Sequence, residues 1–143
     1  MPESTASPMG NKLNSYSAEE VELIYSLGRF YLESGFYHSA EIIFNGLCSI
    51  APDYVPAWLG RSIVKFIHND IDNARTDAHQ AFRLIPESVE AQLMLITLLL
   101  SSKDYSAAGT KLGEIQDLIT SKRLNHPDLI RYFKAQLVRY EKR

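Results

Sequence analysis

Cysteine is nearly absent from this chain of 143 residues, and its scarcity excludes whole classes of structure. Cys48 is the single cysteine, so no internal disulfide can form, and no Cys and His cluster has the spacing of a structural zinc site. A chain of this length can bury a core without such cross-links. We therefore expect a core held by packing alone, in a reducing compartment such as the cytoplasm.

An excess of one charge and long apolar runs are missing as well. The formal net charge is −2, so there is no overall basic field to draw the chain to nucleic acid or anionic lipid. The longest apolar run, residues 93–100, falls far short of the roughly 20 residues of a membrane helix. The first residues show neither the basic start nor the apolar stretch of a secretory signal. We expect an intracellular protein with no membrane insertion and no nucleic-acid partner.

The start of the chain differs in composition from the rest. Residues 1–16 are rich in Ser, Pro, Asn and Gly and contain too few apolar groups to offset the entropy of ordering them. We expect a flexible tail there. Ordered structure is expected from residue 17 onward, since Ser17 and Glu20 have the spacing of a reciprocal capping box at a helix start.

A period of 34 residues runs through the remaining sequence. Ala40, Ala74 and Ala108 follow one another at this interval. Other residues in the same register are Tyr37, Ile71 and Tyr105; Ile50, Leu84 and Leu118; Pro52 and Pro86; and Ala57 and Ala91. Several matches in one register are hard to obtain by chance, so the pattern predicts a helical repeat array.

Apolar residues within each repeat have helical rather than alternating spacing. The expected first helices cover about 18–33, 55–68 and 88–101, and the expected second helices about 37–50, 71–85 and 105–120. Proline ends the second helix of the first two repeats because its ring cannot continue a helix.

The predicted fold class is therefore all-α. The expected domain, 17–143, contains three helix-turn-helix repeats at about 21–54, 55–88 and 89–122, followed by a helix at about 126–141. That last helix is expected to cap the open end of the array.

These positions resemble the tetratricopeptide repeat family over about residues 21–120 and the capping helix. The resemblance implies a right-handed superhelical solenoid in which small residues permit close helix approach and larger residues fill the spaces between helices. The residues with such structural roles are Gly28, Gly35, Ala40, Pro52, Trp58, Ala74, Pro86 and Ala108. Arg61, Ser62 and Lys65 depart from the family pattern, which leaves open which face of that helix is buried.

A narrower resemblance is carried by the run LGRFYLESGFYHSAEIIFNGLCSIAPDY, the later AWLG and the three repeats. Together they look like the small tetratricopeptide chaperones of bacterial type III secretion. Those proteins hold needle subunits or translocator proteins soluble before export. The resemblance implies a binding protein with an amphipathic helix of a secreted subunit as its client.

The family places its partner-binding groove on the first helix of each repeat. By spacing, the expected groove residues are Tyr25, Arg29, Leu32, Leu59, Ile63, Phe66, Leu93, Thr97 and Leu100. This surface is largely apolar. Relatives that grip a C-terminal carboxylate use Lys, Asn and Arg at such positions, and Arg29 alone qualifies here, which disfavours the function of a heat-shock cochaperone.

The run LMLITLLL, residues 93–100, is apolar on every side of its predicted helix. A surface helix of a soluble protein shows one apolar stripe instead. Either neighbouring helices cover the whole circumference, or part of it meets a bound partner. We favour the partner, an amphipathic helix in the groove.

Candidate catalytic residues are few. His38 and Glu41 could supply two ligands to a metal, but a zinc site needs three or four. Cys48 lies among apolar residues, where a small buried hydrophobe is expected rather than a nucleophile. No phosphate-binding loop or nucleophile elbow occurs. We therefore expect no enzyme activity, no metal and no cofactor.

The sequence thus favours a cytoplasmic bacterial chaperone that forms a hetero-oligomer with its client or self-associates weakly. A second small cochaperone is a further candidate partner. The alternative function is a structural tetratricopeptide adaptor within a larger protein complex.

Overall fold

The computed structural model describes residues 16–143, which form seven helices. The helices are α2 (Ala18–Glu33), α3 (Tyr37–Ile50), α4 (Val55–Ile67), α5 (Ile71–Leu84), α6 (Val89–Ser101), α7 (Tyr105–Thr120) and α8 (Pro127–Glu141). No strand occurs within residues 16–143. The all-α prediction is confirmed, and each helix ends within one residue of its expected limits. The predicted tail, 1–16, lies outside the described residues except for Tyr16.

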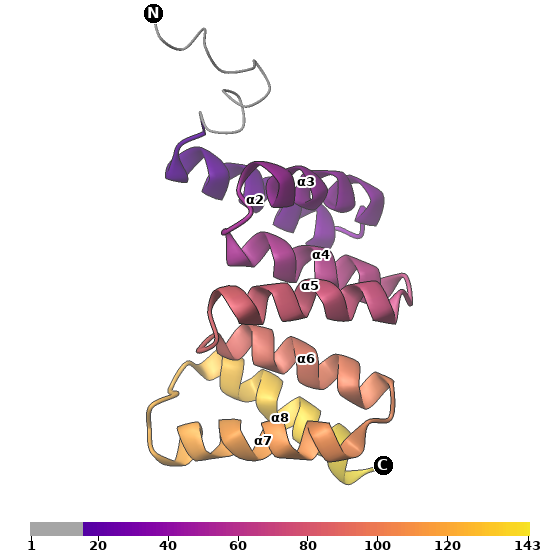
Figure 1. Ribbon diagram of the computed structural model, residues 1–143, viewed down its shortest axis with the longest axis vertical. Coiled ribbons are helices and arrows are strands. Elements are labelled where there is room, and N and C mark those ends of the chain that lie inside the picture. Colours follow the sequence, from indigo (N-terminus) through magenta and orange to yellow (C-terminus); the bar gives the residue numbers. More distant parts are fainter. Residues whose placement is uncertain (1–15) are drawn as a thin grey trace, which may run out of the picture.

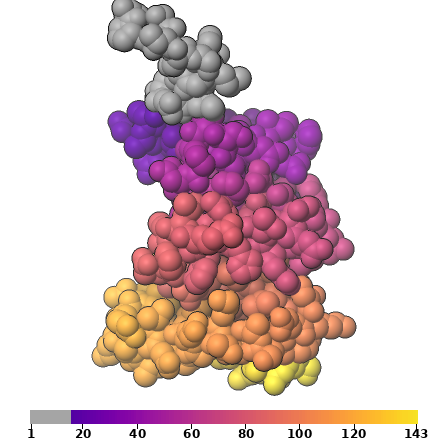
Figure 2. Space-filling model, viewed as in Figure 1, coloured from indigo at the N-terminus to yellow at the C-terminus, as the bar shows by residue number. Residues whose placement is uncertain are grey.

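The helices stack as pairs along the long axis of the molecule (Figure 1). The pairs α2 and α3, α4 and α5, and α6 and α7 follow one another in sequence order, and α8 packs against both α6 and α7 at the C-terminal end. The surface shows the same order, since the sequence colours change in successive bands (Figure 2). This arrangement is the stacked array that the 34-residue period predicts.

Each repeat turns between its two helices in the same way. The second residue after the first helix has a left-handed backbone, with φ of 84° at Gly35, 61° at Asn69 and 61° at Lys103. The next amide then donates to a carbonyl five residues back, as from Phe36 to Tyr31 at 2.8 Å. This is the Schellman closure of a helix, and glycine adopts its left-handed position without strain. The three turns are 34 residues apart, so the sequence period is also a period of backbone conformation.

The first helix begins as its sequence predicts. The backbone amide of Glu20 donates to the Ser17 hydroxyl at 3.1 Å, and the amide of Ser17 donates to the Glu20 carboxylate at 2.9 Å. The capping box is therefore confirmed.

A buried aromatic ring determines how closely α2 and α4 approach. Phe44 of α3 is fully buried. A Cβ atom added at Gly28 or at Gly60 would lie 2.7 Å from its ring, which is too close for any side chain. Two glycines are therefore needed around one phenylalanine. The repeat pattern identifies Gly28 but does not mark Gly60.

The second repeat replaces apolar contacts with polar ones. Ser62 is buried, and its hydroxyl donates to the carbonyl of Ala74 at 2.7 Å. Arg61 and Lys65 both reach the carboxylate of Asp77 on α5, each at 2.9 Å. The face of α4 that carries residues 61, 62 and 65 thus packs on α5, as the repeat register requires. This contact settles which face of the helix is buried.

The Asp77 carboxylate should contribute strongly to stability. Its side chain is only 2% exposed, and two cations depend on it for charge compensation. Replacing Asp77 by Ala leaves Arg61 and Lys65 half-buried and uncompensated, which should lower the free energy of unfolding by about 3 kcal/mol. Urea denaturation measures this loss. Glu114→Ala, a change at an exposed carboxylate of α7, is the control, and equal unfolding midpoints for the two variants would contradict the expectation.

Candidate functional site

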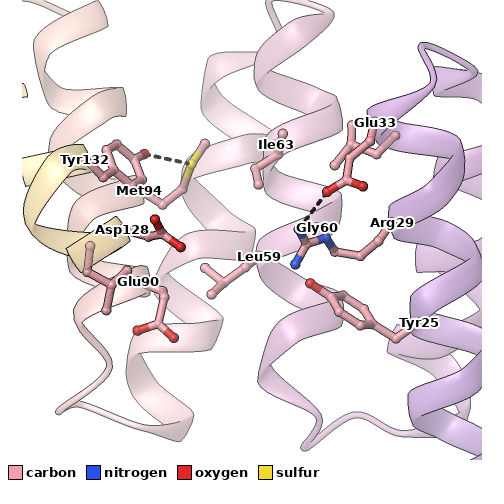
Figure 3. A pocket seen from close by; sticks show the side chains of 12 residues that line it. Tyr25, Arg29, Glu33, Leu59, Gly60, Ile63, Glu90, Met94, Asp128 and Tyr132 are labelled. Atoms are coloured by element: carbon pink, nitrogen blue, oxygen red, sulfur yellow. Dashed lines mark hydrogen bonds and ion pairs between the residues drawn. The ribbon is translucent and has the colours of Figure 1, made fainter. Parts of the chain in front are cut away.

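A cavity of about 400 Å³ opens between α2 on one side and α6 and α8 on the other (Figure 3). The helix α4 lies between these walls and forms the base. The lining residues are Tyr25, Arg29, Leu32, Glu33, Leu59, Gly60, Ile63, Glu90, Met94, Asp128, Leu129 and Tyr132. Four helices that are distant in sequence therefore build one site.

A second cavity adjoins the first and shares Tyr25, Arg29, Leu59 and Glu90 with it. It runs toward the loop before α6, and its other lining residues are Val55, Pro56, Ile85, Glu87, Ser88 and Val89. We call the two adjoining cavities the groove. Their shared residues show that the groove is continuous from α2 to the start of α6.

Helical spacing explains how the walls are made. Tyr25, Arg29 and Leu32 occupy one side of α2, and Leu59 and Ile63 are one turn apart on α4. Gly60 lines the base with its backbone, since a Cβ atom at this position would point to the ring of Phe44 behind α4.

Five expected groove residues line the first cavity: Tyr25, Arg29, Leu32, Leu59 and Ile63. Phe66 does not, because it packs at the edge of the core formed with Met94, Leu95 and Leu98. That the five residues bind a partner stays a prediction.

The third repeat differs from the expectation. Leu93, Thr97 and Leu100 are buried and do not line the groove. The reason is α8, which folds back onto α6: the hydroxyls of Thr97 and Tyr132 share a hydrogen bond of 2.6 Å, and Leu93 and Leu100 lie in one core cluster with Phe133. The placement of these three residues in an open groove was wrong.

The apolar run of α6 is explained by the same packing. Seven of its eight residues, 93–100, are buried, and Leu99 is half-buried at the edge of the same core. Its neighbours are α5, α7 and α8, with a smaller contact to α4. The chain's own helices therefore cover this run except where Met94 lines the groove, so its apolar character does not require a bound partner.

Sequence reasoning missed the other seven lining residues of the first cavity, which are Glu33, Gly60, Glu90, Met94, Asp128, Leu129 and Tyr132. The apolar residues of α8 offer a signal for Tyr132, since Leu129, Tyr132, Phe133 and Leu137 form a stripe wide enough for two contacts. Burial raises the pKa of Tyr132, so its hydroxyl remains a neutral hydrogen-bonding group. No local pattern indicates that Glu90 and Asp128 come together.

Charges are divided between the two walls of the groove. On α2 the guanidinium of Arg29 pairs with the carboxylate of Glu33 at 2.7 Å, and more than half of each side chain is exposed. Facing them are the exposed carboxylates of Glu90 and Asp128 (Figure 3). Exposed pairs such as Arg29 and Glu33 exchange readily with other partners because each contributes little.

The remaining candidates do not gather into a catalytic site. His38 is exposed and Glu41 is half-buried, and within residues 16–143 no three or more His, Cys, Asp or Glu side chains cluster closely enough to hold a metal. Burial raises the pKa of the Cys48 thiol to about 11, so it is protonated at neutral pH and a poor nucleophile. None of the helices described has both the length and the apolar character needed to cross a bilayer.

Comparisons of sequence alone find no relative: no model of a known protein family matches, and no curated protein does. Solved structures do match. The translocator chaperone SycD of Yersinia enterocolitica type III secretion is similar with a TM-score of 0.77 and 21% identity, over 93% of this chain and 96% of that one.

Two further structures have similar folds. PcrH, solved in complex with the chaperone binding region of PopD, has a TM-score of 0.75 and 16% identity over 91% of this chain and 95% of its own. The TPR2AB domain of yeast Sti1, in a complex with pHSP90, has a TM-score of 0.72 and 16% identity over 87% of this chain and 48% of its own. The tetratricopeptide-type fold predicted from the sequence is thereby confirmed.

Leu59 and Leu93 allow a direct test of the groove's extent because they are equivalent positions of consecutive repeats. Leu93→Glu places a carboxylate in a closed apolar core and should cost about 3–5 kcal/mol of unfolding free energy. Leu59→Glu should cost far less, since its carboxylate can reach the open cavity. Chemical denaturation with circular dichroism compares the two, and an equally small loss at both positions would mean that the groove continues across the third repeat.

Proposed function

We propose that this chain is a cytoplasmic chaperone of a bacterial type III secretion system that keeps a secreted subunit soluble by binding its amphipathic helix in the groove. The observation that carries the proposal is the open, apolar-based cavity between α2 and α6, on a fold shared with the chaperones SycD and PcrH. The likeness to a translocator chaperone favours a translocator over a needle subunit as the client.

The groove suits a few apolar anchors rather than a long helix. The apolar surface of the first cavity is about one repeat wide and includes Leu59, Ile63 and Met94. The helix α8 closes the groove on the far side of this surface. An amphipathic helix places anchors at intervals of three and four residues, which matches a site of this size. Burying such anchors supports binding because apolar area is removed from water on both partners.

A structural adaptor within a larger complex is the second candidate. The same fold carries the yeast Sti1 domain, so the fold does not select the partner. Capture of a C-terminal carboxylate remains disfavoured, because Arg29 is the one cation that lines the groove and several carboxylates line it as well. An adaptor would retain one permanent subunit, whereas a chaperone would release its client for export.

A second apolar surface supports the proposal of weak self-association. On α2, the side chains of Leu23, Leu27 and Phe30 are 72%, 44% and 61% exposed and lie on one side of the helix. In the described part of the chain α2 is the first helix of the array, so no preceding repeat packs against it. We propose that a second copy of this chain covers this apolar side of α2. A second small cochaperone is the alternative partner for the same surface.

The groove proposal predicts which protein is captured and how capture is lost. Tagged chain purified from its native host should recover a secreted component of the export system, identified by mass spectrometry. Leu59→Glu should abolish recovery, while Glu114→Gln on α7 should leave it intact. Co-expression of the recovered protein with the unmodified chain should raise its soluble fraction. Recovery of a permanent, non-secreted subunit would favour the adaptor instead.

Self-association through α2 is tested by charge. Leu23→Glu combined with Phe30→Glu should shift the chain to monomer in sedimentation velocity runs at several concentrations, because two carboxylates would face their own copies. Helix content should not change, since both side chains are exposed. An unchanged distribution of species, or a parent chain that is monomeric throughout, would exclude this surface as a self-association site.

A further inference from the structure

The carboxylates that line the groove outnumber its cations. Glu33, Glu87, Glu90 and Asp128 supply the carboxylates, and Arg29 is the one cation among the lining residues of the two cavities. Arg29 is neutralised by Glu33 of its own helix, at 2.7 Å. The whole chain has a formal net charge of only −2. Acidic character is therefore concentrated at the groove rather than spread over the protein.

The acidic wall is separate from the apolar base. Glu90 and Asp128 belong to the wall made by α6 and α8, and Leu59 of α4 lies between them and α2, while Met94 of α6 lies on the same wall close to Tyr132 (Figure 3). Arg131 pairs with Asp128 from the same helix, and both side chains are 72% exposed. Such an exposed ion pair is weak, so Asp128 can pair with another cation in place of Arg131. Glu87 extends the acidic wall along the adjoining cavity. An occupant of the groove thus meets apolar contacts at its base and carboxylates along one edge.

We propose that the groove selects a client segment in which a lysine or arginine lies within one helical turn of the apolar anchors. The anchors pack on Leu59, Ile63 and Met94, and the cation lies against Glu90 and Asp128. This inference rests on the proposed function, since it identifies the chemistry of the client at that same groove. Complementary charge gives specificity because an acidic segment would face like charges along the same wall.

The expected size of the effect follows from exposure. Both carboxylates are exposed, so each contact with a client cation should change the dissociation constant by about two- to fivefold. Added salt should weaken the contribution, because charges at the surface are screened over about 10 Å at 0.1 M ionic strength. The apolar anchors should account for most of the affinity, and the cation for the choice among segments.

A phage-displayed library of random peptides provides a probe that does not depend on a known client. Selection is carried out on the unmodified chain and on the double variant Glu90→Gln and Asp128→Asn, with Glu114→Gln as the matched control. Glu90→Gln alone serves as a second variant that leaves the start of α8 unchanged. A selected peptide and its Lys→Gln and Lys→Glu derivatives are then titrated by fluorescence anisotropy at low and high salt.

The unmodified chain and the Glu114→Gln control should both enrich lysine or arginine beside apolar positions. On the unmodified chain, the Lys→Gln peptide should bind two- to fivefold more weakly than the selected peptide. On the double variant, the two peptides should bind with equal affinity. This inference would be overturned if the selected peptides lose binding with Leu59→Glu, show no enrichment of lysine or arginine, and bind the double variant as tightly as the unmodified chain. That outcome would leave the proposed function intact. Peptides whose binding survives Leu59→Glu, or no bound peptide at all, would overturn the proposed function and the inference with it.

Discussion

The packing of Phe44 between α2 and α4 is the contact on which the rest of the structure depends. Its ring fills the space that side chains at Gly28 and Gly60 would otherwise occupy. The two helices can then approach each other with their opposite faces turned to the groove, where Tyr25 and Leu59 line the cavity. A larger residue at either glycine would separate α2 from α4, and the wall and base of the groove would move apart.

The C-terminal helix α8 has two structural roles. It covers the open end of the array, which every stack of repeats requires because its last repeat has an unfilled apolar face. It also lies over α6, so that Leu93 and Leu100 become core while Asp128 and Tyr132 become a wall of the groove. Closure of the core and the length of the binding surface are therefore set by the same helix.

Polar residues determine the character of both the middle repeat and the groove. The cluster of Arg61, Lys65 and Asp77 is enclosed and compensated, so it contributes to the packing of α4 on α5. The carboxylates of Glu90 and Asp128 are exposed instead and can exchange partners. The difference in burial separates charges that stabilise the fold from charges that are available to the proposed client.

Local structure could be predicted from the sequence because it depends on neighbouring residues. The 34-residue period and the helical spacing of apolar residues give the six repeat helices to within one residue and the turn at Gly35, and local sequence signals give α8 and the capping box of Ser17. The family resemblance, combined with this spacing, places five lining residues of the first cavity on α2 and α4, since both helices belong to regular repeats. The stabilising role of Gly60 and the burial of Asp77 escape this pattern, because each depends on a contact from another helix.

Only the tertiary structure decided where the groove ends. The helix α8 stands outside the repeat register, so no period specifies which of its faces docks or what it covers. Its contact with α6 buries Leu93 and Thr97, and it places Asp128 in the same wall of the cavity as Glu90, although the two residues are distant in sequence. The sequence by itself determined a repeat array with an apolar inner surface, whereas the docking of one non-repeating helix determined how much of that surface remains open and what charge borders it.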